Sequence, residues 1–226
     1  SKNEFFNELE EKLINNKKQF IITANPETIM YSEKNNDLKQ AVIDKDTLVV
    51  ADGIGIVKGA KILNYDINQT IPGIDIAVKL MELGNNYNKK IFLFGAKREI
   101  IEKMKNVIRN KYNNLEIVGA VDGYVENKDK IFEDIKKCEP EIILVALGIP
   151  QQECLIYKHL NEFNKGIFVG VGGSFDVISG DKKRAPKIFI KFKLEWLYRI
   201  LKEPKRIKRF FNSNIKYLYK LYLNKE

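Results

Sequence analysis

Short apolar runs alternate along the chain with longer segments in which apolar residues recur at every third or fourth position. The short runs end at turn residues and predict six strands, at 20–23, 47–50, 90–95, 117–121, 141–148 and 166–173. The longer segments predict helices at 3–17, from Pro26 onward, at 54–62, 73–83, 97–112, 128–137 and 151–163. Strands that are apolar on both faces and alternate with helices are typical of a parallel sheet covered by helices. The pattern therefore predicts an α/β fold with a Rossmann-like, mainly parallel sheet.

The positive charge is concentrated at the end of the chain. Residues 182–226 contain 15 Lys and Arg and three Asp and Glu, a net charge of +12, whereas residues 1–181 carry −3. Apolar and aromatic residues lie among these cations at helical spacing. We therefore expect a catalytic core over 1–181 and a basic, amphipathic helical appendage over 182–226 that meets an anionic membrane surface. A helical pair that packs on the core with its lysines in water fits the same pattern, and the two interpretations are compatible.

The composition also excludes several classes of protein. The chain has no apolar run of 18 residues and no signal-peptide pattern, so we expect neither a transmembrane helix nor secretion. Two cysteines and one histidine, without metal-ligand spacing, argue against a zinc site and for a reducing, cytoplasmic setting. A basic tail could also bind nucleic acid, but the mildly acidic core argues against that alternative.

Polar residues and glycines follow each predicted strand, where parallel sheets bind their ligands. Asp52, between the second strand and Gly53, could accept a proton from a hydroxyl nucleophile. It could equally cap the next helix, and the motif alone favours the cap. Gln151 and Gln152 could bind a sugar or a base, although a solvated helix start explains one of them as well.

The glycines after the last strand allow two interpretations. Gly172 and Gly173 could hold a phosphate at the start of the following helix, or they form a plain strand-to-helix turn. Their spacing is not that of a dinucleotide fingerprint, which argues against an oxidoreductase. The lone His159 is interpreted as a packing or surface residue.

Taken together, several motifs resemble the TagA/WecG/CpsF family of bacterial glycosyltransferases, which build surface polysaccharides and wall teichoic acid. The resemblance covers about residues 20–211. Its motifs, in the family's order, are 25–27, 52–57, 73–75, 148–153, 170–176, 184–186, 194–199 and 203–204, followed by Arg206 and Arg209.

This resemblance implies an inverting, metal-independent transfer with no cofactor beyond the donor. In the teichoic acid branch, the donor is UDP-N-acetylmannosamine and the acceptor is the 4-hydroxyl of N-acetylglucosamine on undecaprenyl diphosphate. UDP-N-acetylmannosamine uronic acid is the alternative donor within the family. The expected location is the inner face of the cell membrane, as a peripheral protein. Self-association through the tail is a further expectation, and nucleic acid is not an expected partner.

The resemblance also assigns roles to individual residues. It makes Asp52 the general base, places Thr23 and Asn25 in the same pocket, and lets Gln152 contact the substrate. Arg199, Arg206 and Arg209 would close over the site and stabilise the leaving diphosphate, since the core has no arginine cluster. The expected nucleotide-binding residues are Gly123, Tyr124, Gln151, Gly172, Gly173 and Asp176.

Two positions depart from the family pattern. Thr70 stands where relatives usually carry an arginine, and it cannot supply a positive charge. Asp122 stands where many relatives have a histidine. Another cation, such as an arginine of the tail, would have to compensate for Thr70.

Overall fold

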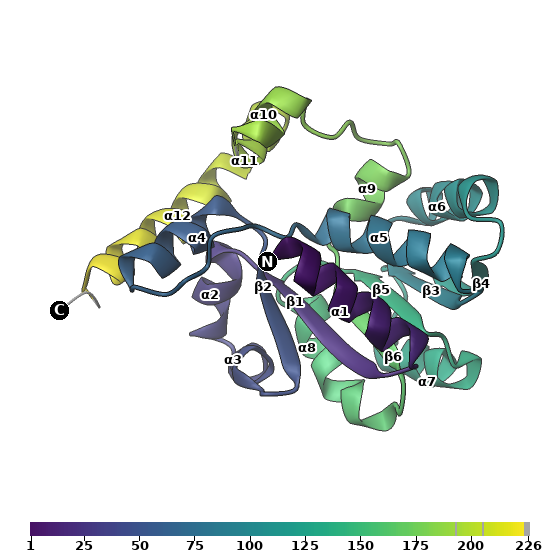
Figure 1. The fold of residues 1–226 in the computed structure, drawn as a ribbon. Helices are drawn as coiled ribbons and strands as arrows, with labels where there is room; N and C mark the ends of the chain where they lie inside the picture. Colours follow the sequence, from purple (N-terminus) through teal and green to yellow (C-terminus); the bar gives the residue numbers. More distant parts are fainter. Residues whose placement is uncertain (193, 205, 224–226) are drawn as a thin grey trace.

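The computed structural model describes residues 1–192, 194–204 and 206–223, apart from the side chains of Arg206 and Arg209. The six strands form one parallel sheet in the order β2-β1-β6-β5-β3-β4 (Figure 1). This confirms the predicted fold class. The strands are β1 (Lys18–Ala24), β2 (Thr47–Ala51), β3 (Lys90–Gly95), β4 (Glu116–Val121), β5 (Ile142–Ala146) and β6 (Gly166–Gly170).

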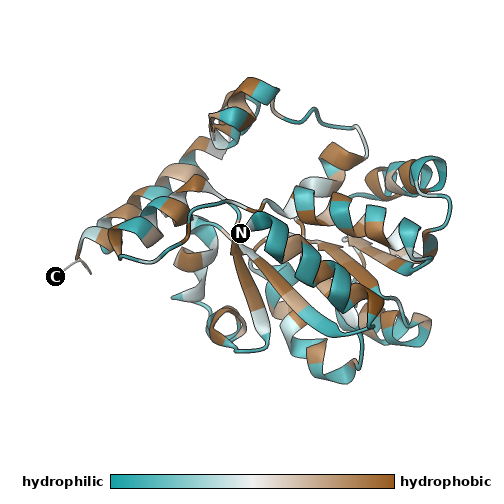
Figure 2. Ribbon diagram, in the orientation of Figure 1, coloured by the Kyte–Doolittle hydropathy of each residue, from teal (hydrophilic) through white to brown (hydrophobic). Residues whose placement is uncertain are grey.

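Helices cover both faces of the sheet. Side chains of α1 (Lys2–Ile14), α5 (Gly73–Asn86), α6 (Arg98–Lys111) and α9 (Ser174–Ile178) join one apolar core. Those of α3 (Asn36–Ile43), α7 (Lys128–Cys138) and α8 (Gln151–His159) join the other. In Figure 2 the strands are largely brown, while the outer surfaces of the covering helices carry most of the teal.

The central strand β5 shows why this sequence makes a two-sided sheet. All five of its residues are buried. Ile142 and Leu144 lie in the core beneath α5 and α6, whereas Ile143 and Val145 lie in the core beneath α7 and α8. Successive side chains of a strand point to opposite faces, so an uninterrupted apolar run supplies both cores at once.

The structure also corrects several predicted boundaries. β5 and β6 are shorter than expected, because the chain turns sharply at Gly148 (φ +82°) and Gly172 (φ +47°) in the left-handed region that favours glycine. Helix α8 ends at His159 and continues as a 3-10 turn, η1 (Leu160–Glu162). Helix α3 was not predicted.

Five further helices lie around the carboxyl ends of the strands or beyond them. They are α2 (Pro26–Ser32), α4 (Ile54–Ile62), α10 (Lys187–Lys191), α11 (Glu195–Lys202) and α12 (Arg206–Leu223). Helix α12 contacts α2 and α4, with Tyr217 and Leu221 buried, while α10 and α11 stand away from the sheet (Figure 1). The C-terminal segment is therefore helical, as predicted, and one of its helices packs on the core. None of the helices in the described part of the chain combines the length and the hydrophobicity that a transmembrane span requires.

Candidate active site

Two neighbouring strands, β1 and β6, send the chain to opposite faces of the sheet. After β1 it enters α2 and α3, and after β6 it enters α9 on the other face. At such a divergence, beyond the carboxyl ends of the strands, α/β proteins bind their ligands. The Thr23 side chain joins the two strands there, because its Oγ1 donates a hydrogen bond to the Gly170 carbonyl over 3.4 Å.

Asp52 lies directly after β2 at the same edge of the sheet. Its Oδ1 accepts a hydrogen bond from the backbone N–H of Gly73, the first residue of α5, over 3.1 Å. The N-cap of α4 is Gly53, and no side chain caps that helix. The interpretation of Asp52 as the cap of the next helix was therefore wrong.

Burial is the main influence on the pKa of the Asp52 carboxyl. It raises the pKa of Asp52 from 3.8 to about 6, although the positive charge of Arg199 and the hydrogen bond from Gly73 act in the opposite direction. The negative charges of Glu195 and Asp75 raise this pKa further. A carboxylate with such a pKa is ionised near neutral pH and is a stronger base than an exposed aspartate, as general-base catalysis requires.

Arg199, whose positive charge lowers the pKa of Asp52, lies on α11, outside the sheet. The C-terminal segment is tied to the same place by Arg184, whose Nη2 lies 2.6 Å from Asp75 Oδ1 near the start of α5. Lys2 Nζ lies 2.9 Å from the other oxygen of Asp75. Arg206 and Arg209 were predicted to close over the site and stabilise the leaving diphosphate, but their side chains are not among those that the structure describes.

Asn25 and Gln152 hold backbone segments of the site in place. Asn25 Oδ1 accepts hydrogen bonds from the N–H groups of Glu27 and Thr28 and so caps α2. Gln152 is buried, and its Oε1 accepts the N–H groups of Gly148 and Gly172 over 3.0 and 3.1 Å. It thereby joins the turns after β5 and β6. Direct contact of either side chain with a substrate stays a prediction.

The expected nucleotide-binding residues lie at the ends of β4, β5 and β6. The Gly123 N–H donates to the Ala96 carbonyl over 2.9 Å, and the neighbouring Tyr124 is 75% exposed. Asp176, after β6, lies 3.5 Å from Lys182 Nζ. Three strand spacings separate β4 from β6, which is roughly 14 Å, enough for an extended nucleotide. Gln151 and Gly173 are exposed at the same edge.

Comparison with known proteins identifies the family. The model of the glycosyl transferase WecG/TagA/CpsF family matches residues 1–226. The chain belongs to this family. It is therefore a glycosyltransferase, and the resemblance carried by the strand-end motifs is confirmed.

Three relatives of this glycosyltransferase carry the same name, N-acetylglucosaminyldiphosphoundecaprenol N-acetyl-beta-D-mannosaminyltransferase. The protein of Bacillus spizizenii is 37% identical over 197 residues, covering 87% of this chain and 76% of its own. That of Bacillus subtilis is 36% identical over 209 residues, covering 92% and 81%. That of Staphylococcus aureus strain MW2 is 36% identical over 203 residues, covering 89% and 79%.

Two cavities of the glycosyltransferase lie away from Asp52. The larger, about 430 Å³, lies at the amino ends of β1 and β2 and is lined by Lys12, Gln19 and Thr47, among others. The smaller, about 290 Å³, lies between α2, α4 and α12. In the described part of the chain, no three His, Cys, Asp or Glu residues are grouped in a way that could hold a metal ion. The metal-independent reaction stays a prediction.

Sequence reasoning missed Glu153, the neighbour of Gln152. Its side chain is 1% exposed, and burial raises its pKa to about 7. The residue lies within a motif that was singled out, but an acidic residue in the first turn of a helix normally indicates a solvated, dipole-stabilised position. Only the packing of α8 against β1 and β6 reveals that it is buried.

Proposed function

We propose that this chain transfers N-acetylmannosamine from UDP-N-acetylmannosamine to the 4-hydroxyl of N-acetylglucosamine on undecaprenyl diphosphate, the linkage-unit step of teichoic acid synthesis. The observation that carries the proposal is Asp52, a partly buried carboxylate with a pKa of about 6 at the carboxyl ends of the parallel strands. The names of the three relatives, which specify this sugar and this acceptor, support it.

The proposed reaction is an inverting displacement without a metal ion. Asp52 takes the proton of the acceptor hydroxyl while the hydroxyl oxygen attacks the anomeric carbon of the donor. The bond from that carbon to the phosphate oxygen breaks on the opposite face, and the electron pair leaves with UDP. Because negative charge then grows on the diphosphate, a fixed cation near the site lowers the barrier. Arg199, which already acts electrostatically on Asp52, is the described residue that best fits this task.

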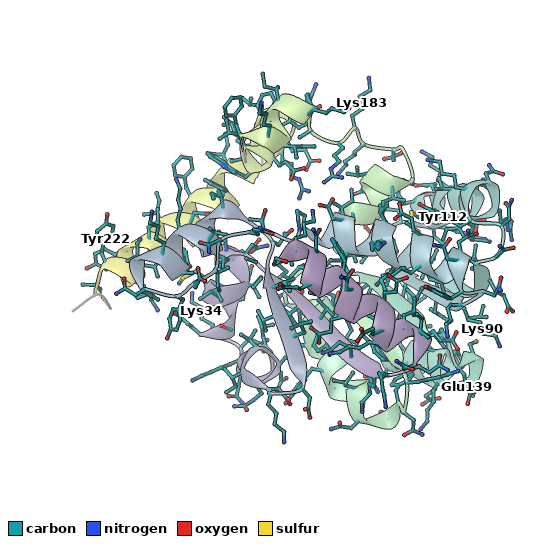
Figure 3. The ribbon with its side chains drawn as sticks, viewed as in Figure 1. Lys34, Lys90, Tyr112, Glu139, Lys183 and Tyr222 are labelled. Atoms are coloured by element: carbon teal, nitrogen blue, oxygen red, sulfur yellow. The ribbon has the colours of Figure 1, made fainter. Side chains whose placement is uncertain are left out.

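The C-terminal helices supply a surface suited to the lipid-linked acceptor. On α12, large apolar side chains lie exposed along one stripe, at Phe211, Ile215, Tyr219 and Tyr222. Side chains project outward from this helix around Tyr222 (Figure 3). Apolar and aromatic residues flanked by lysines are typical of helices that lie in a membrane interface. The proposed location is therefore the inner face of the cell membrane, with the protein bound peripherally.

The donor is tested by incubating the full chain with a short-chain polyprenyl-diphosphate N-acetylglucosamine and each of three UDP-sugars. These are UDP-N-acetylmannosamine, its uronic acid and UDP-N-acetylglucosamine. Mass spectrometry should show a disaccharide product with the first donor, in reactions with and without EDTA, and NMR should show inverted anomeric configuration. Transfer from the uronic acid alone would replace the proposed donor, and transfer that EDTA abolishes would contradict the metal-independent mechanism.

Membrane binding is tested by sedimentation with vesicles that contain phosphatidylglycerol or phosphatidylcholine alone. Serine at Phe211, Ile215 and Tyr222 together should weaken binding to the anionic vesicles, because the exposed apolar stripe is removed. The control variant carries Ile43→Ser and Val49→Ser. Both residues are exposed apolar residues outside the C-terminal segment, and this variant should bind the vesicles as the unaltered chain does. Equal binding of the two variants would contradict the assigned surface.

A further inference from the structure

Glu153 is a buried acid, and only one of its two carboxyl oxygens has a hydrogen-bond partner in the described part of the chain. Its Oε1 accepts a hydrogen bond from Gln152 Nε2 over 2.7 Å. Its Oε2 is enclosed and has no hydrogen-bond partner among the described residues. A buried carboxylate without a hydrogen-bond partner for its charge lowers the stability of the fold. The presence of an acid at this position therefore requires a structural or functional explanation.

The carboxyl of Glu153 fixes the orientation of Gln152. The amide oxygen of Gln152 must face the N–H groups of Gly148 and Gly172, because its amide nitrogen cannot accept from them. That orientation turns Nε2 toward Glu153, which offers the matching acceptor. Gln152 also lies flat against Gly170, where an added Cβ would come within 2.6 Å of Nε2.

A continuous series of contacts leads from Gln152 to Asp52. The Gly170 carbonyl, beside Gln152, accepts the hydrogen bond of Thr23. Thr23 Oγ1 in turn packs against Gly73, where an added Cβ would lie 3.3 Å from it. The N–H of Gly73 holds Asp52 Oδ1. A shift of Gln152 would thus disturb both glycine turns and the support of the proposed base.

We propose that Glu153 is a positioning residue of this active site, which acts as a neutral carboxylic acid to hold Gln152 against the turns after β5 and β6. The inference rests on the proposed function, since it assigns those turns to the donor site. Glu153 does not touch the reacting atoms and acts through Gln152.

The surroundings of Glu153 favour the neutral form. Burial is the largest cause of its raised pKa of about 7, and the negative charge of Glu27 on α2 raises it further. The hydrogen bonds from Gln152 and from its own backbone N–H act against this rise. Of the other elements packed on α8, β1 and β6 present uncharged residues at this end, and Asp37 of α3 acts on the adjacent Cys154.

The positioning role is tested by a double-mutant cycle on the full chain with the acceptor analogue described above. Glu153→Ala alone should lower kcat by about 10- to 100-fold, since small misplacements within an active site have effects of this size. In a Gln152→Ala background the same change should have little further effect, because the two residues act as one unit. Independent, multiplying effects would overturn the proposal. Glu133→Gln, at an exposed position on α7, is the control and should keep the kcat of the unaltered chain.

The neutral form is tested with Glu153→Gln, which keeps the shape and the acceptor oxygen but cannot ionise. The kcat of the unaltered chain should fall as the pH rises above about 7, while kcat of this variant should not. Identical pH profiles would contradict the proposed protonation state. Because this variant conserves volume, it remains informative where Glu153→Ala fails to fold.

A stability measurement separates this inference from the proposed reaction. The pKa of Glu153 rises from 4.5 to about 7 on folding, so the folded chain keeps a proton that the unfolded chain has released. The unaltered chain therefore loses stability as the pH rises through this window. The Tm of Glu153→Gln minus that of the unaltered chain should grow between about pH 5 and pH 8. A constant difference would overturn the inference even if sugar transfer is confirmed, and a growing one would support it even if the substrate is another sugar.

Discussion

Apolar side chains have opposite surroundings in the core and in the C-terminal helices. Every residue of β5 is buried, whereas α10 and α11 have no buried residue among those described. Leu201, Ile188 and Phe192 are each more than 60% exposed. The sheet buries its hydrophobic residues in two cores, while α10 and α11 keep theirs at least partly exposed. Such a surface favours an apolar partner, and a membrane interface fits the lysines beside it.

The two regions also differ in how they are held. The sheet is stabilised by parallel pairing of all six strands and by two buried cores. Of the C-terminal helices, α12 packs on α2 and α4 with Tyr217 and Leu221 buried, whereas α10 and α11 have no buried residue among those described. The ion pair between Arg184 and Asp75 ties the segment before α10 to α5. Yet Arg199 on α11 influences Asp52. The proposed base therefore belongs to the sheet, and the electrostatic tuning of its pKa depends on α11, a helix without a buried residue among those described.

The largest expected effect comes from Asp52→Asn, within the core. The asparagine keeps an oxygen for the Gly73 N–H but cannot accept a proton, so kcat should fall by about 10²- to 10⁴-fold. The Tm should not fall, because a partly buried carboxyl whose pKa is raised on folding is replaced by a neutral group. Undiminished sugar transfer by the folded variant would remove Asp52 as the base.

Arg199→Ala tests whether the C-terminal helices tune the core. The positive charge of Arg199 lowers the pKa of Asp52, so its removal should raise that pKa above about 6 and move the acid limb of the rate profile to higher pH. A smaller loss of kcat, roughly tenfold, should accompany the shift if this cation also meets the diphosphate. Arg199→Lys keeps the charge and should leave the acid limb in place. An unmoved limb in both variants would show that the two regions act separately.

Two glycine substitutions compare the stability of the regions. A Cβ at Gly59 would lie 2.0 Å from Tyr217 Oη, and a Cβ at Gly119 in β4 would lie 2.1 Å from the Phe92 ring. Each overpacked site should lose about 1–3 kcal/mol. Gly59→Ala should release hydrogen-exchange protection in α12 alone, whereas Gly119→Ala should lower the free energy of global unfolding. Global destabilisation by both would show that α12 is an integral part of the core.

The smallest expected effect is that of Lys220→Ala, which removes the ion pair between α12 and Glu33, the C-cap residue of α2. Both side chains are exposed by more than a third, so the loss should be about 0–1 kcal/mol. Chemical denaturation should detect little change, and protection of α12 should persist. Release of α12 by this substitution would mean that charge, more than the Tyr217 and Leu221 packing, holds the helix.

Much of the fold was predictable because its signal is local. The apolar run of β5 and the spacing of the covering helices predict a parallel sheet without tertiary information. Helix α3 escaped prediction, since Leu38 and Ala41 are its only buried residues and its apolar stripe is too short to stand out. Asp52 was predicted as a candidate base, but the same motif favoured a helix cap. Only the structure excludes the cap, because Gly53 is the N-cap of α4 and Asp52 accepts from the distant Gly73; the role as base stays a prediction.

The sequence by itself determined the alternating strands and helices, the basic C-terminal segment and the polar residues at the strand ends. Each of these features depends on residues that are close together along the chain. The tertiary structure decided how these parts act on one another. It placed Gly73 against Asp52, brought the charge of Arg199 near that carboxyl and buried Glu153 behind Gln152. A pKa depends on burial and on charges that can lie far away along the chain, and no local pattern contains either.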